Sequence, residues 1–221
     1  MRMVPRWLFI ACMLAATAVF VAVAVLAWGP WREFFASPAR LGVVAASLVA
    51  TVAACCSDIN LSAGRREDRG SRWIFVPFAL YSALLTWLPP YCDRRDILTL
   101  DGDTLRYAGL VVFIIGGALR VAPMFVLGPR FSALVAIQRE HELVTDGLYG
   151  VIRHPSFLGA GLAILGWCLV FRSILGLLLM PIAVWLGVAR INAEEVLLAA
   201  EFGERYAAYR RRTWRLIPWV Y

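Results

Sequence analysis

The chain has 221 residues, of which 61% are hydrophobic and only 17% are charged. A soluble domain is typically about 45–50% apolar and about 25% charged, so this composition excludes a disordered chain and a disulfide-stapled mini-protein and indicates a membrane protein. The formal net charge is +7, and all 22 basic residues are arginines that lie between apolar blocks rather than in one basic domain. This distribution argues against a nucleic-acid partner and favours charges that flank membrane segments.

Long apolar segments predict an all-α, polytopic membrane protein with about six membrane helices. The first segment, 7–28, carries no charge and is longer than the roughly 7–15-residue apolar region of a signal peptide, so we expect a retained helix. The next three expected spans are 41–61, 73–90, which Pro89-Pro90 bounds, and 105–127, which Gly116, Gly117, Arg120 and Pro123 interrupt.

The last apolar stretch, 158–188, is too long for one span and is broken near Phe171-Arg172-Ser173. We expect a tight C-terminal helical hairpin of two short membrane helices there, as the fifth and sixth spans. The large polar segments 129–157 and 190–221 then lie on one side of the membrane. We therefore divide the chain into N-terminal membrane helices, 1–128, and a C-terminal region, 129–221, which holds a cytoplasmic loop, the hairpin and a C-terminal cytoplasmic helix.

The arginines predict the orientation of these helices. With six spans, fifteen arginines fall on the side of the termini and five on the other side. Because cytoplasmic loops carry the excess of Lys and Arg, both termini are expected to be cytoplasmic. The acidic loop 93–103 then lies outside, with no assigned role. The all-arginine, Ala- and Val-rich usage favours a bacterial source, and hence the inner membrane.

The segment 138–159 reads QREHELVTDGLYGVIRHPSFLG and contains both histidines of the chain. A residue before proline is pushed out of helical geometry, and proline is favoured at the first helical position, so a helix is predicted to begin at Pro155. The free N–H groups of such a helix start suit an anionic ligand group. A plainer interpretation makes His154 and Tyr149 interfacial residues and Arg153 a positive-inside anchor.

A second polar segment, 190–218, reads RINAEEVLLAAEFGERYAAYRRRTWRLIP. Arg190 and Glu194 are four residues apart and share one helical face, while Glu195 lies on the adjacent face. From spacing alone, this is an intrahelical ion pair on a juxtamembrane helix. The arginines at 210–212 would then bind anionic lipid.

Taken together, the strings HELVTDGLY, RHPSFLG and EEVLLAAEFGERYAAY, followed by IP, resemble the isoprenylcysteine carboxyl methyltransferase family. Members of this family are integral membrane enzymes that use S-adenosylmethionine, and phospholipid methyltransferases are relatives. The resemblance covers about residues 138–218, whereas the first four helices share only their hydrophobicity. No G-x-G-x-x-G fingerprint follows a strand pattern, which argues against a Rossmann-type methyltransferase.

The resemblance implies a site residue by residue. Arg190 aligns with an arginine on the substrate side and is the expected catalytic residue, and no metal site is expected. Phe157 stands where tyrosine is common in the family, and Arg120 receives no role. The residues implied to bind the cofactor are Gln138, which requires a gap in the alignment, His141, Glu142, Leu143, Val144, Tyr149, His154, Pro155, Ser156, Phe157 and Glu194.

The expected reaction is methyl transfer from S-adenosyl-L-methionine to a lipophilic acceptor, a small molecule or a prenylated substrate, that enters from the bilayer. A carboxylate acceptor is ionised at pH 7 and needs a cation such as Arg190 to align it. An amine or thiol acceptor instead needs a base, for which Glu194, Glu195 and His154 are available. The alternatives are a phospholipid N-methyltransferase, a thiol S-methyltransferase, a sterol-reductase-like NADPH enzyme and a non-catalytic membrane scaffold.

Overall fold

A computed structural model of the chain describes residues 5–57, 66–67, 73–128, 136–137 and 143–221. The described part is helical, apart from the antiparallel pairing of two-residue strands β1 and β2. Its elements are α1 (Arg6–Trp28), α2 (Trp31–Ala36), α3 (Pro38–Cys56), β1 (Arg66–Glu67), α4 (Phe75–Arg95), α5 (Asp103–Leu127), β2 (Ala136–Ile137), the 3-10 turn η3 (Gly147–Gly150), α6 (Pro155–Val170), α7 (Ile174–Leu178), α8 (Met180–Phe202) and α9 (Glu204–Arg212).

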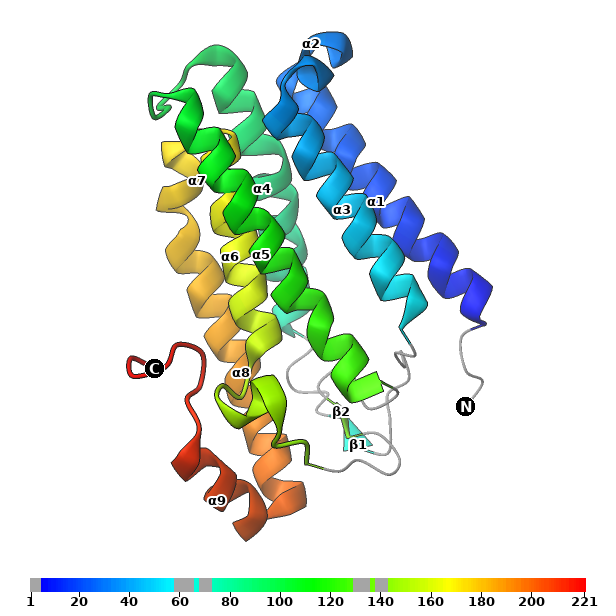
Figure 1. The fold of residues 1–221 in the computed structure, drawn as a ribbon, viewed down its shortest axis with the longest axis vertical. Coiled ribbons are helices and arrows are strands. Elements are labelled where there is room, and N and C mark those ends of the chain that lie inside the picture. Colours follow the sequence, from blue (N-terminus) through cyan, green and yellow to red (C-terminus); the bar gives the residue numbers. More distant parts are fainter. Residues whose placement is uncertain (1–4, 58–65, 68–72, 129–135, 138–142) are drawn as a thin grey trace.

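The long helices form an elongated bundle (Figure 1). The short helix α2 lies at one end, while α9 and the β1–β2 pair lie toward the opposite end, where α1 begins (Figure 1). Within the described residues, four stretches are long and apolar enough to cross a membrane, namely α1, α3, α5 and the run 174–202, and α6 is a shorter apolar helix. The predicted polytopic, all-helical membrane protein is therefore confirmed.

Two of the expected interruptions are wrong. Pro89 and Pro90 do not end a helix, because α4 continues to Arg95 and ends at Asp96, whose φ is +49°. Likewise α5 is continuous through Gly116, Gly117, Arg120 and Pro123. Packed neighbouring helices make such prolines and glycines tolerable inside membrane helices. As a consequence, Asp93 is a residue of α4 and not of the acidic loop.

The C-terminal region also differs from expectation. The break at 171–173 is present between α6 and α7, but α8 then continues to Phe202. Arg190 and Glu194 therefore belong to α8, and the separate C-terminal helix is only α9, which begins at Glu204. The apolar stretch 158–188 ends before α8 does, because charged side chains do not interrupt the backbone hydrogen bonds of a helix.

The closest contact in the bundle joins α5 to α6, and glycines make it possible. A Cβ added to Gly116 would lie 2.3 Å from the Ala163 nitrogen, and one added to Gly166 would lie 2.4 Å from the Phe113 nitrogen. Gly109 and Gly159 face the opposite backbone in the same way, with distances of 2.6 and 2.5 Å. Small residues let helix backbones approach closely in a membrane, where apolar surface alone drives no association. The glycines therefore fix the register of α5 on α6.

At the end of the bundle near α2, a buried carboxylate ties several elements together. Asp93 accepts two hydrogen bonds from Arg106 of α5, at 2.8 and 3.0 Å. It also accepts one from Trp28 Nε1 at 3.1 Å and one from Arg172 Nε at 3.2 Å. Asp93 thus connects α1, α4, α5 and the turn between α6 and α7, and Arg106 additionally donates to the Val170 carbonyl at 2.8 Å.

The glycine contact predicts a sharp difference between two adjacent positions. Gly116→Ala places a methyl group against the Ala163 backbone, whereas a Cβ at Gly117 meets nothing within 4 Å. Overpacking of this kind costs about 1–3 kcal/mol, so we expect Gly116→Ala to lower the thermal unfolding midpoint in detergent by several degrees. Gly117→Ala, the matched control, should leave it unchanged. Equal midpoints for the two variants would contradict the proposed backbone contact.

Candidate active site

The candidate site is built where α6 begins. His154 has φ −126° and ψ 59°, which is not helical, and Pro155 occupies the first turn of α6. The helix start predicted from the His-Pro pair is therefore confirmed. His154 is buried, at 4% exposure. Its backbone carbonyl accepts hydrogen bonds from the Phe157 and Leu158 N–H groups. A buried imidazole therefore lies at the N-terminal end of α6.

Glu195 of α8 holds this imidazole in place. Its Oε1 accepts a hydrogen bond from Arg153 Nε at 3.0 Å and lies 3.3 Å from His154 Nε2. Its Oε2 lies 2.9 Å from an Arg215 nitrogen. Glu195 is only 5% exposed, and a buried carboxylate is stable only when cations and hydrogen bonds surround it in this way. Both of its oxygens are occupied by these contacts, so Glu195 holds Arg153, His154 and Arg215 together.

The chain after α9 adds a backbone strap to the same place. Trp214 pairs with Ile152 in a parallel bridge. The Arg153 N–H donates to the Trp214 carbonyl at 2.8 Å, and the His154 N–H donates to the Arg215 carbonyl at 3.2 Å. The C-terminal residues therefore fix the backbone of 151–154 while Arg215 fixes Glu195. No sequence motif predicted this role for Trp214 and Arg215.

Two tyrosines, Tyr149 of η3 and Tyr209 of α9, lie beside this network. The Tyr209 hydroxyl donates to the Tyr149 carbonyl at 2.7 Å. Burial raises the pKa of Tyr209 to about 12. Burial also raises the pKa of Tyr149, with a further contribution from the nearby charge of Glu194. Both hydroxyls therefore stay protonated at neutral pH and remain hydrogen-bond donors.

Glu194 is the carboxylate of this region that remains accessible. Its side chain is 39% exposed, against 6% for Glu195, and its Oε1 lies 3.9 Å from His154 Nδ1. Tyr149 lies within electrostatic range of it. The predicted residues Tyr149, His154 and Glu194, which come from η3, the start of α6 and α8, are thus brought together. Arg190 lies one helical turn before Glu194 on α8, with its guanidinium 5.4 Å from the Phe75 ring centre.

Arg120 joins this group from α5. Its Nη1 donates to the Ser156 hydroxyl at 2.6 Å, and Arg190 and Glu194 are both within its electrostatic range. No motif assigned Arg120 a role, although an ionisable residue within an apolar helix is by default a functional-site hypothesis. The site therefore draws one arginine from α5 and another from α8.

The remaining predicted residues have different surroundings. Pro155 is fully buried, and the Phe157 ring meets the His154 ring edge-on at 5.9 Å between centres. Leu143 and Val144 are half-buried just before η3. Gln138, His141 and Glu142 lie outside the described residues. Among the described residues, no group of three His, Cys, Asp or Glu side chains is arranged to hold a metal ion.

Comparison with known proteins identifies the family of this chain. A model of the isoprenylcysteine carboxyl methyltransferase family matches residues 109–200. Protein-S-isoprenylcysteine O-methyltransferase of Schizosaccharomyces pombe is 36% identical over 158 residues, which are 67% of each chain. The chain belongs to the isoprenylcysteine carboxyl methyltransferase family. Family membership places it among the integral membrane methyltransferases.

Other comparisons agree with this assignment. Protein-S-isoprenylcysteine O-methyltransferase B of Arabidopsis thaliana is 34% identical over 51% of this chain and 58% of its own. Protein-S-isoprenylcysteine O-methyltransferase of Homo sapiens is 31% identical over 63% of this chain and 50% of its own. The chain thus spans about half to two thirds of these methyltransferases. The solved structure of the eukaryotic intramembrane Ras methyltransferase ICMT shares the fold, with a TM-score of 0.57 and 24% identity over 94% of this chain and 77% of that chain.

The family match also begins earlier than the motifs indicated. It starts at Gly109 and so includes most of α5, with Arg120, in addition to the segments recognised from 138 onward.

The Glu195 network predicts a specific loss of stability. Glu195→Gln removes the negative charge between Arg153 and Arg215, and breaking a buried ion pair costs about 3–5 kcal/mol. We expect the thermal midpoint to fall by about 6–20 °C in detergent. The control is Glu201→Gln, which removes an exposed carboxylate from the same helix. A midpoint for Glu195→Gln equal to that of the control would contradict the organising role of Glu195.

Proposed function

We propose that this chain transfers a methyl group from S-adenosyl-L-methionine to the carboxylate of an S-isoprenylcysteine-like acceptor. The acceptor class comes from the printed names of its relatives, which are protein-S-isoprenylcysteine O-methyltransferases. The observation that carries the proposal is that Arg190 and Glu194 of α8 lie within electrostatic range of Arg120 of α5, at one end of a bundle of apolar helices. Two arginines beside apolar helices suit the carboxylate of a lipophilic acceptor.

The donor groups present fit S-adenosyl-L-methionine, which carries an ammonium, a carboxylate and hydroxyls. The accessible Glu194 carboxylate suits the ammonium or the hydroxyls, and the N-terminal end of α6 beside Ser156 suits the carboxylate. The predicted cofactor residues Leu143, Val144, Tyr149 and Phe157 would line the same space, whereas the predicted Gln138, His141 and Glu142 lie outside the described residues. When bound, this cofactor supplies an electrophilic methyl group on a sulfonium.

The residues of the chain then act by position and charge. An ionised carboxylate is already a nucleophile, so no side chain needs to remove a proton. Arg190 would bind and align the acceptor carboxylate, with Arg120 close enough to assist, and such orientation accounts for much of the acceleration in reactions of this kind. The prenyl chain would approach laterally between apolar helices, which also keep water from the reacting atoms.

The membrane arrangement completes the proposal. We infer six spans, formed by α1, α3, α4, α5, α6 and the run through α7 and α8, with α6 and α7–α8 as the expected hairpin. The 16 residues of α6 extend about 24 Å at 1.5 Å each, which is short for a span but compatible with local thinning of the bilayer. The arginine bias supports cytoplasmic termini and a site in region 129–221 that faces the cytoplasm, joined by Arg120 of α5. An inner bacterial membrane is the proposed location.

Arg190 is predicted to serve the acceptor rather than the cofactor. We expect Arg190→Ala to lower methyl transfer to an S-farnesylcysteine probe by at least about 100-fold, because the alignment of the carboxylate is lost. The affinity for S-adenosylmethionine, measured by titration calorimetry, should change less than about threefold. Arg205→Ala, which removes an exposed arginine of α9, is the control. Equal loss of turnover and cofactor affinity would refute this division of roles.

Glu194 is predicted to serve the cofactor. Glu194→Gln removes the charge that would pair with an ammonium, so the affinity for S-adenosylmethionine should fall about tenfold or more in calorimetry. Glu201→Gln, one of the exposed positions further along α8, should bind normally. An unchanged affinity in Glu194→Gln would remove Glu194 from the site, and binding of NADPH in place of S-adenosylmethionine would favour the reductase alternative.

A further inference from the structure

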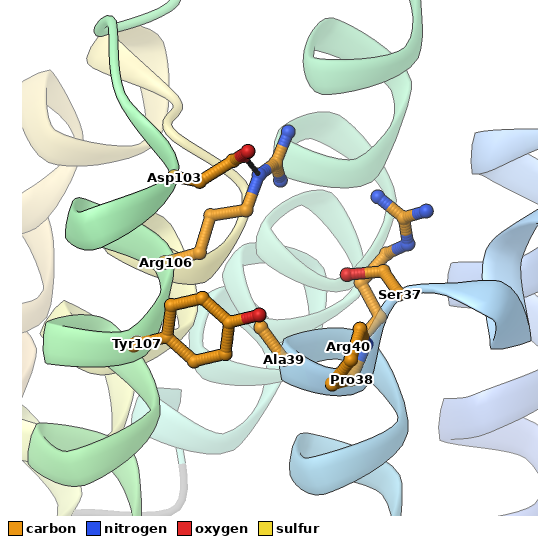
Figure 2. A pocket seen from close by; sticks show the side chains of 7 residues that line it. All are labelled: Ser37, Pro38, Ala39, Arg40, Asp103, Arg106 and Tyr107. Atoms are coloured by element: carbon orange, nitrogen blue, oxygen red, sulfur yellow. Dashed lines mark hydrogen bonds and ion pairs between the residues drawn. The ribbon is translucent and has the colours of Figure 1, made fainter.

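A polar cavity lies at the end of the bundle opposite the candidate active site, between the starts of α3 and α5. Its lining residues are Ser37, Pro38, Ala39, Arg40, Asp103, Arg106 and Tyr107. Figure 2 shows Asp103, Arg106 and Tyr107 contributed by α5 on one side, with Ser37 and Arg40 from the α3 side facing them across the gap. Both helices are membrane-spanning stretches that begin here, so the cavity lies at the level where lipid head groups meet the hydrocarbon core.

The arginines around this cavity outnumber their buried counter-charges. Arg40, Arg106 and Arg172 converge on Asp93, and their side chains are 9%, 11% and 16% exposed. Asp93 is the buried carboxylate they share, at 1% side-chain exposure. The further acidic partners of Arg106 and Arg172 are Asp103 and Asp96, which are 86% and 77% exposed and thus well hydrated. The three arginines thus have three acidic partners, but of these carboxylates only Asp93 is buried with them.

Arg40 has one donor without a close acceptor. Its Nε and Nη2 donate to the carbonyls of Phe34 and Glu33, both at 2.9 Å. Its Nη1 lies 3.7 Å from Asp93 Oδ2, which is beyond hydrogen-bond distance. Asp93, Arg106, Arg172 and Arg94 are all within electrostatic range of this guanidinium. An anion in the adjacent cavity would give Nη1 a hydrogen-bond acceptor.

We propose that this cavity binds the phosphate of an anionic phospholipid from the leaflet on this side of the membrane. Arg40 and Arg106 would bind the phosphate, since guanidinium groups match phosphate oxygens in geometry and charge. The hydroxyls of Ser37 and Tyr107 would donate further hydrogen bonds. The lipid chains would follow the seam between α3 and α5, along the exposed Leu41. This site is separate from the candidate active site and does not depend on the proposed methyl transfer.

The test measures lipid binding to the delipidated full chain by native mass spectrometry in detergent. The probe is 1,2-dioleoyl phosphatidylglycerol, with 1,2-dioleoylglycerol, which lacks phosphate, and glycerol 1-phosphate, which lacks acyl chains, as comparison ligands. Ser37→Asp adds a carboxylate at the cavity while keeping a good helix cap, and Asp103→Asn removes one. The matched controls outside the lining are Thr104→Asp and Asp101→Asn.

We expect phosphatidylglycerol to bind wild type more tightly than either comparison ligand. Ser37→Asp should weaken this binding about five- to tenfold and Asp103→Asn should tighten it about two- to threefold, while both controls stay within about twofold. Unfolding midpoints equal to wild type would confirm that the variants are folded. Equal binding of dioleoylglycerol, or no difference between the variants and their controls, would overturn the proposal. Glycerol 1-phosphate binding as tightly as the lipid would indicate a site for a soluble phosphate instead.

Discussion

The backbone contact between α5 and α6 determines the position of both charged ends of the molecule. Gly109 and Gly116 on one helix and Gly159 and Gly166 on the other let the two backbones meet without side chains between them. Such a contact admits one register, because a shift along either helix would bring a larger residue into the gap. At one end this register sets Arg120 against Ser156, and at the other it sets Arg106 against the Val170 carbonyl.

The two ends use buried carboxylates differently. At the candidate active site, Glu195 contacts Arg153, Arg215 and the buried His154, and it leaves its neighbour Glu194 accessible. At the other end, Asp93 is shared by three arginines. The first arrangement fixes the backbone and imidazole around a candidate site that must be rigid to orient reactants. The second holds the membrane helices together beside the proposed lipid site.

Local sequence patterns predicted the features that depend on few neighbours. The helix start at Pro155 follows from the rules for residues before and at proline, and the break at 171–173 follows from a polar interruption in an overlong apolar stretch. Pro89-Pro90 misled the same reasoning, because tertiary packing allows α4 to continue through them. Local patterns therefore predicted which segments are helical, whereas the C-terminal end of α4 depended on packing.

Features that join distant parts of the chain were not predictable in this way. Asp93 meets Trp28 and Arg172 across 65 and 79 residues of sequence, and nothing local marks them as partners. Of the adjacent glutamates Glu194 and Glu195, spacing alone could not decide which is buried, because that depends on Arg153, Arg215 and the C-terminal strap. Arg120 was noticed as an intramembrane charge, yet its position beside Ser156 required the α5–α6 register.

If Arg120 and Arg190 align a carboxylate acceptor, as proposed, the product is a methyl ester and no general base is needed. Product analysis with S-adenosylmethionine labelled on its methyl group tests this most directly, with S-farnesylcysteine and phosphatidylethanolamine offered together to the purified protein. We predict label in a methyl ester of the farnesylcysteine, released as methanol by mild alkali, and none in the lipid amine. Alkali-stable label in the phospholipid would contradict this prediction, because the acceptor would then be an amine and not the carboxylate that the two arginines are proposed to align.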